Sequence, residues 1–263
     1  YSTFLPQGSS KNLKNKRYKH MEYAAPEITQ KNFAYEDDDV IVVNKPAGIA
    51  THPLLREEQN TLIQQIVLLR PEIQAVDPAS LRPGVVHRLD RNTSGLIVIA
   101  KNKNAHLHLI KQFSERKAEK HYTALVRGPM FEDQGTIETL IGRDPGNKKR
   151  QKTYSSIDPA ARRRNLKPAL TAWRVLKNFQ EWSLIEASPK TGRRHQIRVH
   201  LASIGHPLAG DNLYGFKDTP IPGGLTRHFL HASYLKFTGA DGKIYKFESP
   251  LPEELDRVLR TLK

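Results

Sequence analysis

The sequence predicts an α+β fold in which a mixed, largely antiparallel β-sheet is flanked by helices. Segments with strand-like apolar patterns are joined in some places by short turns and in others by helices, which favours an α+β sheet over a regular βαβ array. The 263 residues correspond to between one and two typical domains and show no internal repeat. Apolar residues make up 38% of the chain, and with 16 glycines this composition is close to that of globular proteins.

The first half of the chain is expected to alternate strands with helices. Apolar runs bounded by turn residues predict strands at residues 40–43, 85–86, 96–100 and 121–127. Apolar residues at three- and four-residue spacing predict helices at residues 61–69 and 104–117. Asn60 or Thr61 is expected to cap the first helix, which ends before Pro71 because the residue preceding a proline disfavours helix.

The second half begins with residues 142–168, which are rich in Gly, Pro, Lys and Arg and are expected to form a long basic loop. Further strands are predicted by their apolar patterns at residues 169–176, 182–187, 229–237 and 243–248, and helices at residues 195–204 and 252–262. Gly205 stands where a helix commonly ends in a left-handed glycine, and Pro252 is suited to a first helical turn. Residues 1–32 are polar and basic without a period, so we expect a flexible N-terminal arm before one folded domain at 33–263.

The charge of the chain points to a polyanionic partner. With 42 Lys and Arg against 27 Asp and Glu, the formal net charge is +15. Residues 1–20 contain five Lys or Arg and no acid, and residues 141–170 contain nine against two acids, so these two stretches hold 12 of the 15 charges. Nucleic acid is the favoured partner, because clustered Lys and Arg neutralise phosphates and release counterions. A merely soluble cationic surface and, less favoured, an anionic membrane surface are the alternatives.

Several other classes of protein are excluded by composition. The chain has no Cys, which rules out a disulfide framework, a thiolate nucleophile and Cys-ligated metal. No apolar run approaches the roughly 20 residues that span a bilayer, and residues 1–20 lack the apolar core of a secretory signal. We therefore expect a cytoplasmic protein that does not bind membranes.

Three polar segments contain candidate chemical groups. In the first, residues 87–95, Asp90 lies between Arg88 and Arg91, and these cations favour an ionised carboxylate that can act as nucleophile or base. A loop cap held by backbone N–H groups is the structural alternative. In the second, residues 191–201, spacing of four places Arg194 with Arg198, so the helix could present Arg198 to a carboxylate or simply form a solvated basic face.

The third segment, residues 120–128, alternates like a strand, so Tyr122 shares a face with Ala124 and Val126. Tyr122 is either a core residue or an aromatic ring lining a base pocket.

Metal binding is disfavoured, since His195 and His200 are five residues apart and no HExxH sequence occurs. His106 and His108 are expected to face solvent.

Together the three segments resemble the RluA-type family of RNA pseudouridine synthases, over roughly residues 33–255. The resemblance rests on HRLDRNTSGL at 87–96, KHYTALVRG at 120–128 and GRRHQIRVHLA at 192–202. Supporting matches are DDDVIVVNKPAGIATHP at 37–53, GDNLYG at 210–215 and RHFLHA at 227–232. The sequence departs from the family at Asn92, where Asp is more frequent, and at Arg194, where Thr is common, which bears on substrate preference rather than on activity.

The resemblance implies the pseudouridine synthase catalytic fold and an isomerase that needs no cofactor and no metal. It implies that Asp90 attacks the target uridine, that Tyr122 stacks on the flipped uracil and that Arg198 pairs with the aspartate. Arg88 matches an arginine that enters the RNA helix in place of the flipped base. Further substrate or RNA contacts are expected from His87, Arg91, Arg193, His195 and Gln196. The expected partner is ribosomal large-subunit RNA or tRNA, without an obligatory protein partner.

The competing interpretation is a non-catalytic RNA-binding protein of the same fold. Such a protein would bind RNA without turnover, and its sequence would lack one or more of Asp90, Tyr122 and Arg198. All three residues are present, so the sequence favours the enzyme. A metal-dependent nuclease is a remote third possibility.

Overall fold

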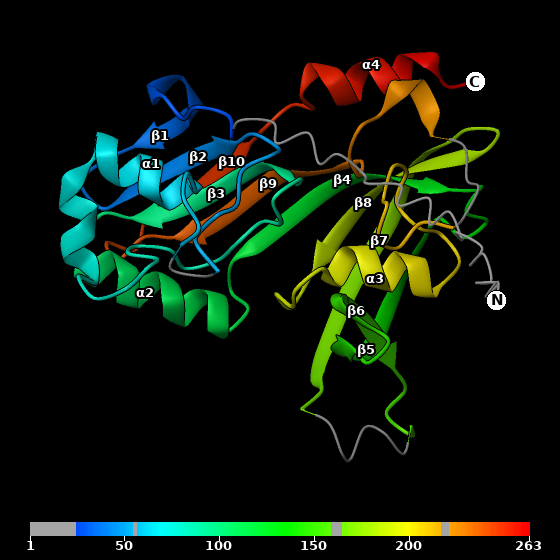
Figure 1. The fold of residues 1–263 in the computed structure, drawn as a ribbon, viewed down its shortest axis with the longest axis horizontal. Helices are drawn as coiled ribbons and strands as arrows, with labels where there is room; N and C mark the ends of the chain where they lie inside the picture. Colours follow the sequence, from blue (N-terminus) through cyan, green and yellow to red (C-terminus); the bar gives the residue numbers. More distant parts are fainter. Residues whose placement is uncertain (1–24, 55–56, 159–164, 217–220) are drawn as a thin grey trace, which may run out of the picture.

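The computed structural model describes residues 25–54, 57–158, 165–216 and 221–263 (Figure 1). Its strands are β1 (Phe33–Glu36), β2 (Val40–Lys45), β3 (Ser94–Ala100), β4 (Glu119–Arg127), β5 (Gln134–Asp144), β6 (Asn147–Tyr154), β7 (Lys167–Asn178), β8 (Trp182–Pro189), β9 (Leu230–Thr238) and β10 (Ile244–Glu248). Its α-helices are α1 (Leu62–Leu69), α2 (Lys103–Ser114), α3 (Gln196–Ser203) and α4 (Glu253–Thr261). None of the helices in these ranges is long and apolar enough to cross a bilayer.

The strands form one sheet in the order β1-β2-β3-β9-β4-β8-β7-β5-β6, with β10 added to β9. All neighbours pair antiparallel except β3 and β9, which are parallel over Ser94–His231 and Gly95–Ala232. Figure 1 shows β9 and β4 in the middle of the sheet. The expected α+β architecture with a largely antiparallel sheet is therefore confirmed.

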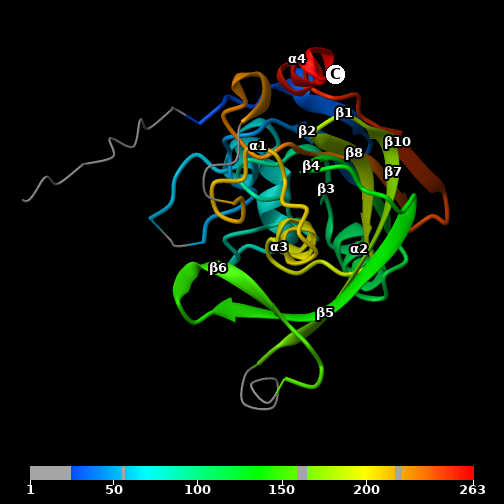
Figure 2. The same cartoon turned by 90° about the vertical axis from the view of Figure 1, so that its right-hand side faces the viewer.

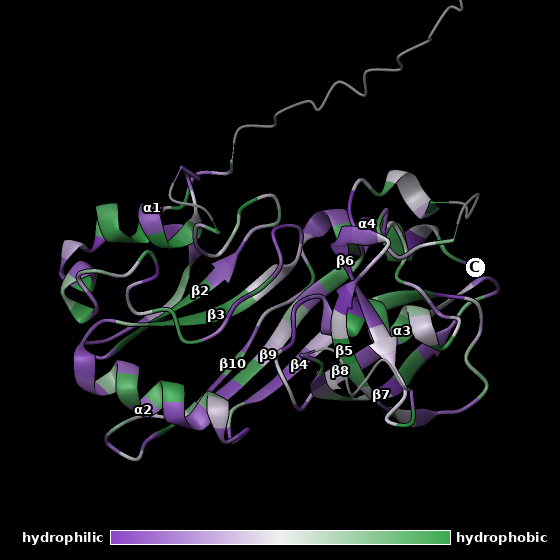
Figure 3. Cartoon of the chain, turned by 60° about the horizontal axis from the view of Figure 1, so that its bottom comes forward, coloured by the Kyte–Doolittle hydropathy of each residue, from purple (hydrophilic) through white to green (hydrophobic). Residues whose placement is uncertain are grey.

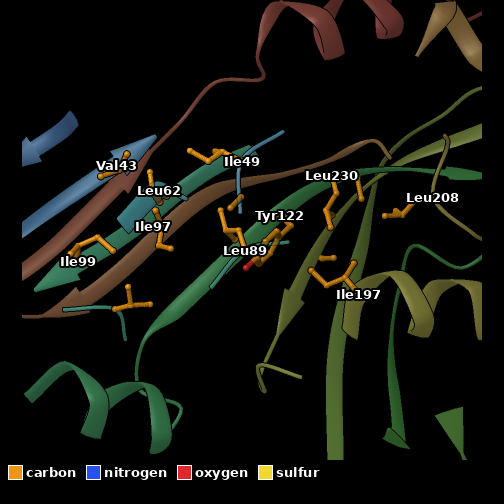
Figure 4. Close-up of a cluster of buried hydrophobic side chains, with 14 of the residues drawn as sticks. Val43, Ile49, Leu62, Leu89, Ile97, Ile99, Tyr122, Ile197, Leu208 and Leu230 are labelled. Carbon is orange, nitrogen blue, oxygen red and sulfur yellow. The ribbon is translucent and has the colours of Figure 1, made fainter. Parts of the chain in front are cut away.

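Both faces of the sheet are covered, and the alternation of strand side chains decides which residue faces which helix. On one face, a core that includes Ile41 and Val43 of β2 and Ala124 of β4 packs against α1 and α3 (Figure 4). On the other face, the intervening residues Val40 and Val42 pack against α2. Farther along that second face, Leu125 of β4 belongs to a separate cluster with α4.

Gly95 allows β3 to approach β9 closely enough to pair with it. Its φ of +116° lies in the region that residues with a Cβ rarely adopt, and an added Cβ would lie 2.3 Å from the carbonyl oxygen of Ala232. Because β3 begins at Ser94, this contact fixes the end of the polar segment 87–95 against the centre of the sheet.

The helix ends mostly agree with expectation. The side chain of Thr61, rather than that of Asn60, forms a capping box with Gln64 at the start of α1. Gly205 follows α3 with a φ of +88°, as expected for a residue that ends a helix. Ile204, the last residue of the helix predicted at 195–204, follows α3 and is 40% exposed.

The expected basic loop at 142–168 is wrong, because most of its described residues lie in strands. They complete β5, form the turn into β6 and begin β7, and β5 pairs with β6 from Leu140–Tyr154 to Asp144–Asn147. Figure 2 shows this hairpin extending from the sheet below α3, and Figure 3 shows that β6 is mainly hydrophilic. Apolar alternation could not reveal it, because β6 is an edge strand with charged side chains and only two buried residues. Arg162–Arg164 lie outside the described residues.

Three smaller expectations are also corrected. The flexible arm does not reach residue 32, because Ile28 is buried in the core and its N–H donates to the Gln65 side chain at 2.7 Å. Residues 85–86 form no strand, although Val85 makes an isolated bridge to Ile99. His106 is buried rather than solvent-facing, since its side of α2 packs toward the core.

Replacing Gly95 by Ala tests the close contact between β3 and β9. We expect Gly95→Ala to lower the free energy of unfolding by about 2 kcal/mol or more, because the new Cβ meets backbone atoms and the φ is unfavourable. Urea unfolding followed by circular dichroism measures this change. Gly192→Ala is the matched control, since no atom lies within 4 Å of the added carbon, and equal effects of the two variants would contradict the interpretation.

Candidate active site

The segment that carries Asp90 has no regular strand or helix, so other segments must satisfy its backbone groups. Thr51 bonds both the N–H and the carbonyl of Leu89 through its hydroxyl, at 3.2 and 2.9 Å. The fully buried ammonium of Lys45 donates to the carbonyl of Arg91 at 3.1 Å, and also to the carbonyls of Pro46 and Ile49. The end of β2 and the loop that follows it thus fix the backbone on both sides of Asp90.

The residues just before β9 and at its start hold the next residues of the segment. Arg227 donates to the carbonyl of Asn92 at 3.0 Å and to the hydroxyl of Ser94 at 2.9 Å. A hydrogen bond of 2.8 Å joins His228 to Thr93, and His231 bonds Ser94 at 2.9 Å. Arg227, His228 and His231 are all buried, so these contacts form a rigid support behind Asp90.

Arg198 of α3 connects Asp90 to a second carboxylate, Asp211. Its Nη1 donates to Oδ2 of Asp90 at 3.0 Å, while its Nε and Nη2 donate to the two oxygens of Asp211 at 2.8 and 2.9 Å. The Asp211 side chain is fully buried and also accepts from the N–H groups of Leu213 and Tyr214. The centre of the Tyr214 ring lies 5.1 Å from the guanidinium carbon of Arg198. Asp211 therefore orients Arg198, and Arg198 orients Asp90.

The electrostatics of this cluster keep Asp90 ionised. Burial by itself raises the pKa of Asp90, but Arg198, together with His195 and His228 where these are protonated in acid, outweighs burial and lowers it. Burial lowers the pKa of His195 to about 4 and that of His228 to about 3, so both imidazoles are neutral at pH 7. At neutral pH the cation that stabilises the Asp90 carboxylate is therefore Arg198.

His195 lies directly before α3 and close to the carboxylate. Its Nε2 is 3.9 Å from Oδ2 of Asp90, and its Nδ1 is bonded to the Tyr214 hydroxyl at 2.9 Å. Its φ of +55° is unusual for a residue with a Cβ. Strained backbone of this kind is retained where surrounding contacts fix the conformation, and it clusters at functional sites.

Tyr122 of β4 is buried beside the same site. It belongs to the core cluster that includes Leu89, Ile197 and Leu230, and Figure 4 shows it between Leu89 and Leu230. Burial, together with the charge of Asp90, raises the pKa of Tyr122, so its phenol is neutral at pH 7. Tyr122 is therefore part of the core and also lines the cleft described next, and its stacking on a base stays a prediction.

A cleft of about 780 Å³ opens above Asp90 and Tyr122. Asp90 is its one lining acid, whereas eight of its described lining residues are cationic: Arg82, Arg88, Arg116, Lys120, Lys190, Arg193, Arg194 and Arg198. Within the described ranges, Arg198 alone of these eight forms an ion pair. A cleft with unpaired cations around one ionised carboxylate is suited to a polyanion that presents a reactive group at Asp90.

The other predicted contact residues divide into two groups. Arg88 and Arg193 line the cleft, with Arg88 exposed, and His195 lies at its base. Arg91 instead pairs with Glu58 at 2.5 Å, outside this cleft.

His87 and Gln196 also line the cleft, but their polar atoms bond within the protein. Nε2 of His87 accepts from the N–H of Val98 at 3.0 Å. The Gln196 amide bonds to four groups around it, those of Leu170, Thr171, Thr191 and Arg193. The polar atoms of Arg91, His87 and Gln196 thus bond to groups of the protein itself.

Sequence reasoning assigned no role to five residues that shape the site: Lys45, Asp211, Tyr214, Arg227 and His228. Four of them lie in the GDNLYG and RHFLHA segments, which were recognised as supporting matches but gave no spacing from which a contact could be inferred. Lys45 occurs in a turn-like sequence that suggests exposure. No group of three or more His, Cys, Asp or Glu among the described residues is arranged to hold a metal ion.

The chain that forms this cleft matches a known protein family. Residues 39–203 match the RNA pseudouridylate synthase family, and they include Asp90, Tyr122 and Arg198. The chain belongs to this family. The resemblance to RluA-type pseudouridine synthases is thereby confirmed, and so is the prediction of an isomerase that converts uridine to pseudouridine in RNA.

Individual relatives agree with this assignment. An uncharacterized RNA pseudouridine synthase of Aquifex aeolicus is 40% identical over 86% of this chain and 71% of its own length. A ribosomal large subunit pseudouridine synthase D of Nitrosomonas europaea is 39% identical over 87% of this chain, which spans 64% of that relative. The solved structure of human RNA pseudouridylate synthase domain containing 1 matches with a TM-score of 0.68 and 30% identity, over 84% of this chain and 83% of that one.

Removing Arg198 tests the charge balance of the synthase site. We expect Arg198→Gln to lower the free energy of unfolding at pH 7 by about 3–5 kcal/mol, because two carboxylates lose their cation. Arg174→Gln is the control, since Arg174 pairs with Glu186 at the surface and its loss should cost less than about 1 kcal/mol.

A comparison of wild type with Arg198→Gln also gives a pH test. The pKa values of Asp90 and Asp211 are lowered in the native protein, so their contribution to stability is present at neutral pH and is lost as the pH falls below about 4. In Arg198→Gln the unpaired carboxylates take up protons at higher pH. The difference in unfolding free energy between wild type and variant should therefore narrow from pH 7 to pH 4, and a constant difference would contradict the assignment.

Proposed function

We propose that this synthase isomerises a uridine of ribosomal large-subunit RNA, with Asp90 as the attacking carboxylate. The observation that carries the proposal is the ionised Asp90 paired with Arg198 at the base of a cleft lined by unpaired cations. Relatives of Nitrosomonas europaea and Neisseria meningitidis, each 39% identical, are named ribosomal large subunit pseudouridine synthase D, which supports ribosomal over transfer RNA. A cytoplasmic location follows from that substrate.

The reaction rearranges one nucleotide without any net change in composition. The bond between uracil N1 and ribose C1′ breaks, a bond from uracil C5 to C1′ forms, and the proton lost from C5 is matched by one gained at N1. A uridine stacked in a helix cannot reach Asp90, so it must leave the stack at a cost of a few kcal/mol. Contacts between the cleft cations and backbone phosphates offset this cost.

Each predicted site residue has a part in this proposal. Asp90 attacks the nucleotide, and Arg198 keeps the Asp90 carboxylate anionic and oriented. The Tyr122 ring stacks on the flipped uracil. Arg88 and Arg193 contact the RNA from the rim of the cleft, and His195 contacts the substrate beside Asp90. Arg91, His87 and Gln196 act indirectly, by fixing the segments that carry these groups: Arg91 through Glu58, His87 through Val98 and Gln196 through Thr191.

The β5–β6 hairpin is proposed to hold the RNA outside the catalytic cleft. Lys148, Lys149 and Lys152 are exposed on β6, and Arg143 is exposed on β5. The hairpin contacts the site through Tyr214, whose hydroxyl accepts from the N–H of Gln151 at 2.7 Å. In this arrangement residues 25–263 act as the catalytic domain.

Replacing Asp90 by Asn tests the proposed chemistry. With a large-subunit RNA fragment as substrate, Asp90→Asn should reduce kcat by at least about 10³-fold, since the amide is not a nucleophile, while RNA affinity is retained. Quantitative mapping of pseudouridine gives the rate, and Asp38→Asn, at an exposed acid, is the control. Turnover by Asp90→Asn at the wild-type rate would refute the mechanism. Turnover of tRNA but not of the ribosomal fragment would refute the proposal that the substrate is ribosomal large-subunit RNA.

Charge reversal on the hairpin tests its role in holding RNA. Lys148→Glu with Lys149→Glu should weaken RNA binding and flatten the dependence of log Kd on log salt concentration by about 0.7–0.9 for each lost phosphate contact. Fluorescence anisotropy at several salt concentrations measures both. Lys246→Glu on the exposed side of β10 is the control. If the hairpin variant has the same Kd and the same salt dependence as this control, the hairpin does not contact the RNA.

A further inference from the structure

We infer that the end of the cleft beside α2 is a second RNA subsite, in which Lys120 and Arg116 bind a backbone phosphate of the target nucleotide or its neighbour. The inference rests on the proposed function and extends it, because it assigns a contact to residues that have no part in the chemistry at Asp90. The ligand is a phosphodiester of the same RNA whose uridine enters the site.

The cleft continues from Tyr122 to the C-terminal end of α2. Ile110, Phe113 and Ser114 of the helix line this part, followed by Arg116 and Lys120. Lys120 precedes Tyr122 by two residues on β4, and that spacing is about 7 Å along a strand. A group bound at Lys120 therefore belongs to the nucleotide stacked at Tyr122 or to the next one.

Lys120 is a half-buried cation that lacks a counter-charge. Its Nζ lies 5.5 Å from the centre of the Phe113 ring, and no carboxylate of the described chain is within ion-pair distance. Burial lowers the pKa of Lys120 to about 8, which leaves the amine mainly protonated at pH 7. A desolvated ammonium is stabilised by an anion, and a phosphate oxygen supplies a strong charge-assisted acceptor.

His87 holds the aromatic floor of this subsite in place. The His87 and Phe113 rings are stacked with their centres 4.4 Å apart and their planes at 16°. Burial lowers the pKa of His87 to about 3, so the ring is neutral, consistent with Nε2 accepting a hydrogen bond from the N–H of Val98. The first residue of the HRLD sequence therefore supports Phe113 and Lys120, while its last residue reacts.

Arg116 follows α2 in a conformation that favours glycine. Its φ is +62°, at a position where helices commonly end in a left-handed Gly because a Cβ is strained there. The exposed Arg116 side chain lines the cleft, and no ion pair to it is formed by the described residues. Strain retained at a cationic residue beside Lys120 is consistent with selection for binding rather than for stability.

Three variants of the full chain test the subsite: Lys120→Gln, Arg116→Gly and, as the control, Lys111→Gln. Lys111 is exposed on α2 and does not line the cleft. The first two variants should each raise Kd for the large-subunit RNA fragment by about tenfold and flatten its salt dependence, whereas the control should match wild type. Arg116→Gly removes the backbone strain, so its Tm should not fall, and its loss of affinity then cannot come from unfolding.

Methylphosphonate substitution then locates the phosphate. Each linkage within two nucleotides of the target uridine is replaced in turn by this neutral group. One position should weaken binding to wild type but not to Lys120→Gln, because both changes remove the same contact. Penalties that are equal in the two proteins at every position, or affinities of Lys120→Gln and Arg116→Gly equal to that of Lys111→Gln, would overturn the subsite. Isomerisation of the same RNA by wild type is measured separately, so a failure of the proposed chemistry is distinguished from a failure of the subsite.

Discussion

The site depends on a single guanidinium that is shared by two carboxylates. Arg198 gives two donors to Asp211 and one to Asp90, and the buried Asp211 is held in turn by backbone N–H groups. These bonds fix the orientation of the Asp211 side chain, and Asp211 in turn fixes the direction in which Arg198 donates to Asp90. The buried pair of Arg198 and Asp211 contributes no net charge, so Asp90 is the one negative group among the described residues that line the cationic cleft.

The rest of the fold keeps Asp90 in reach of that guanidinium. An irregular segment has no ladder of its own, so its position is set by partners from other elements. Here those partners are buried side chains at the end of β2 and in the segment just before β9, foremost Lys45 and Arg227. Gly95 completes the arrangement, since its lack of a Cβ allows β3 to pair with β9 directly after the segment. A rigid sheet thus holds the Asp90 carboxylate at a fixed position, although the segment that carries it has no regular secondary structure.

The sequence predicted most strands and helices correctly where apolar periodicity was strong, as in β2, β3, β4 and α1. It failed at the β5–β6 hairpin, because an edge hairpin with exposed charges carries no apolar pattern and is stabilised by pairing across the sheet. It also failed at residues 25–32, where Ile28 is buried in the core although the segment has no apolar period. The distribution of charge, concentrated at 1–20 and 141–170, indicated a polyanionic partner without indicating where the cleft lies.

By itself the sequence determined the fold class and the family resemblance and singled out three candidate site residues, because these depend on local patterns and short motifs. The contact between Asp90 and Arg198, which the family resemblance implied, joins residues 108 positions apart, and no local pattern of the sequence gives it. The same holds for Asp211 and Lys45, whose roles arise from burial against distant groups. The physical reason is that a buried charge is stable only where its partners converge, and that convergence is a property of the packed sheet and helices rather than of any segment of the chain.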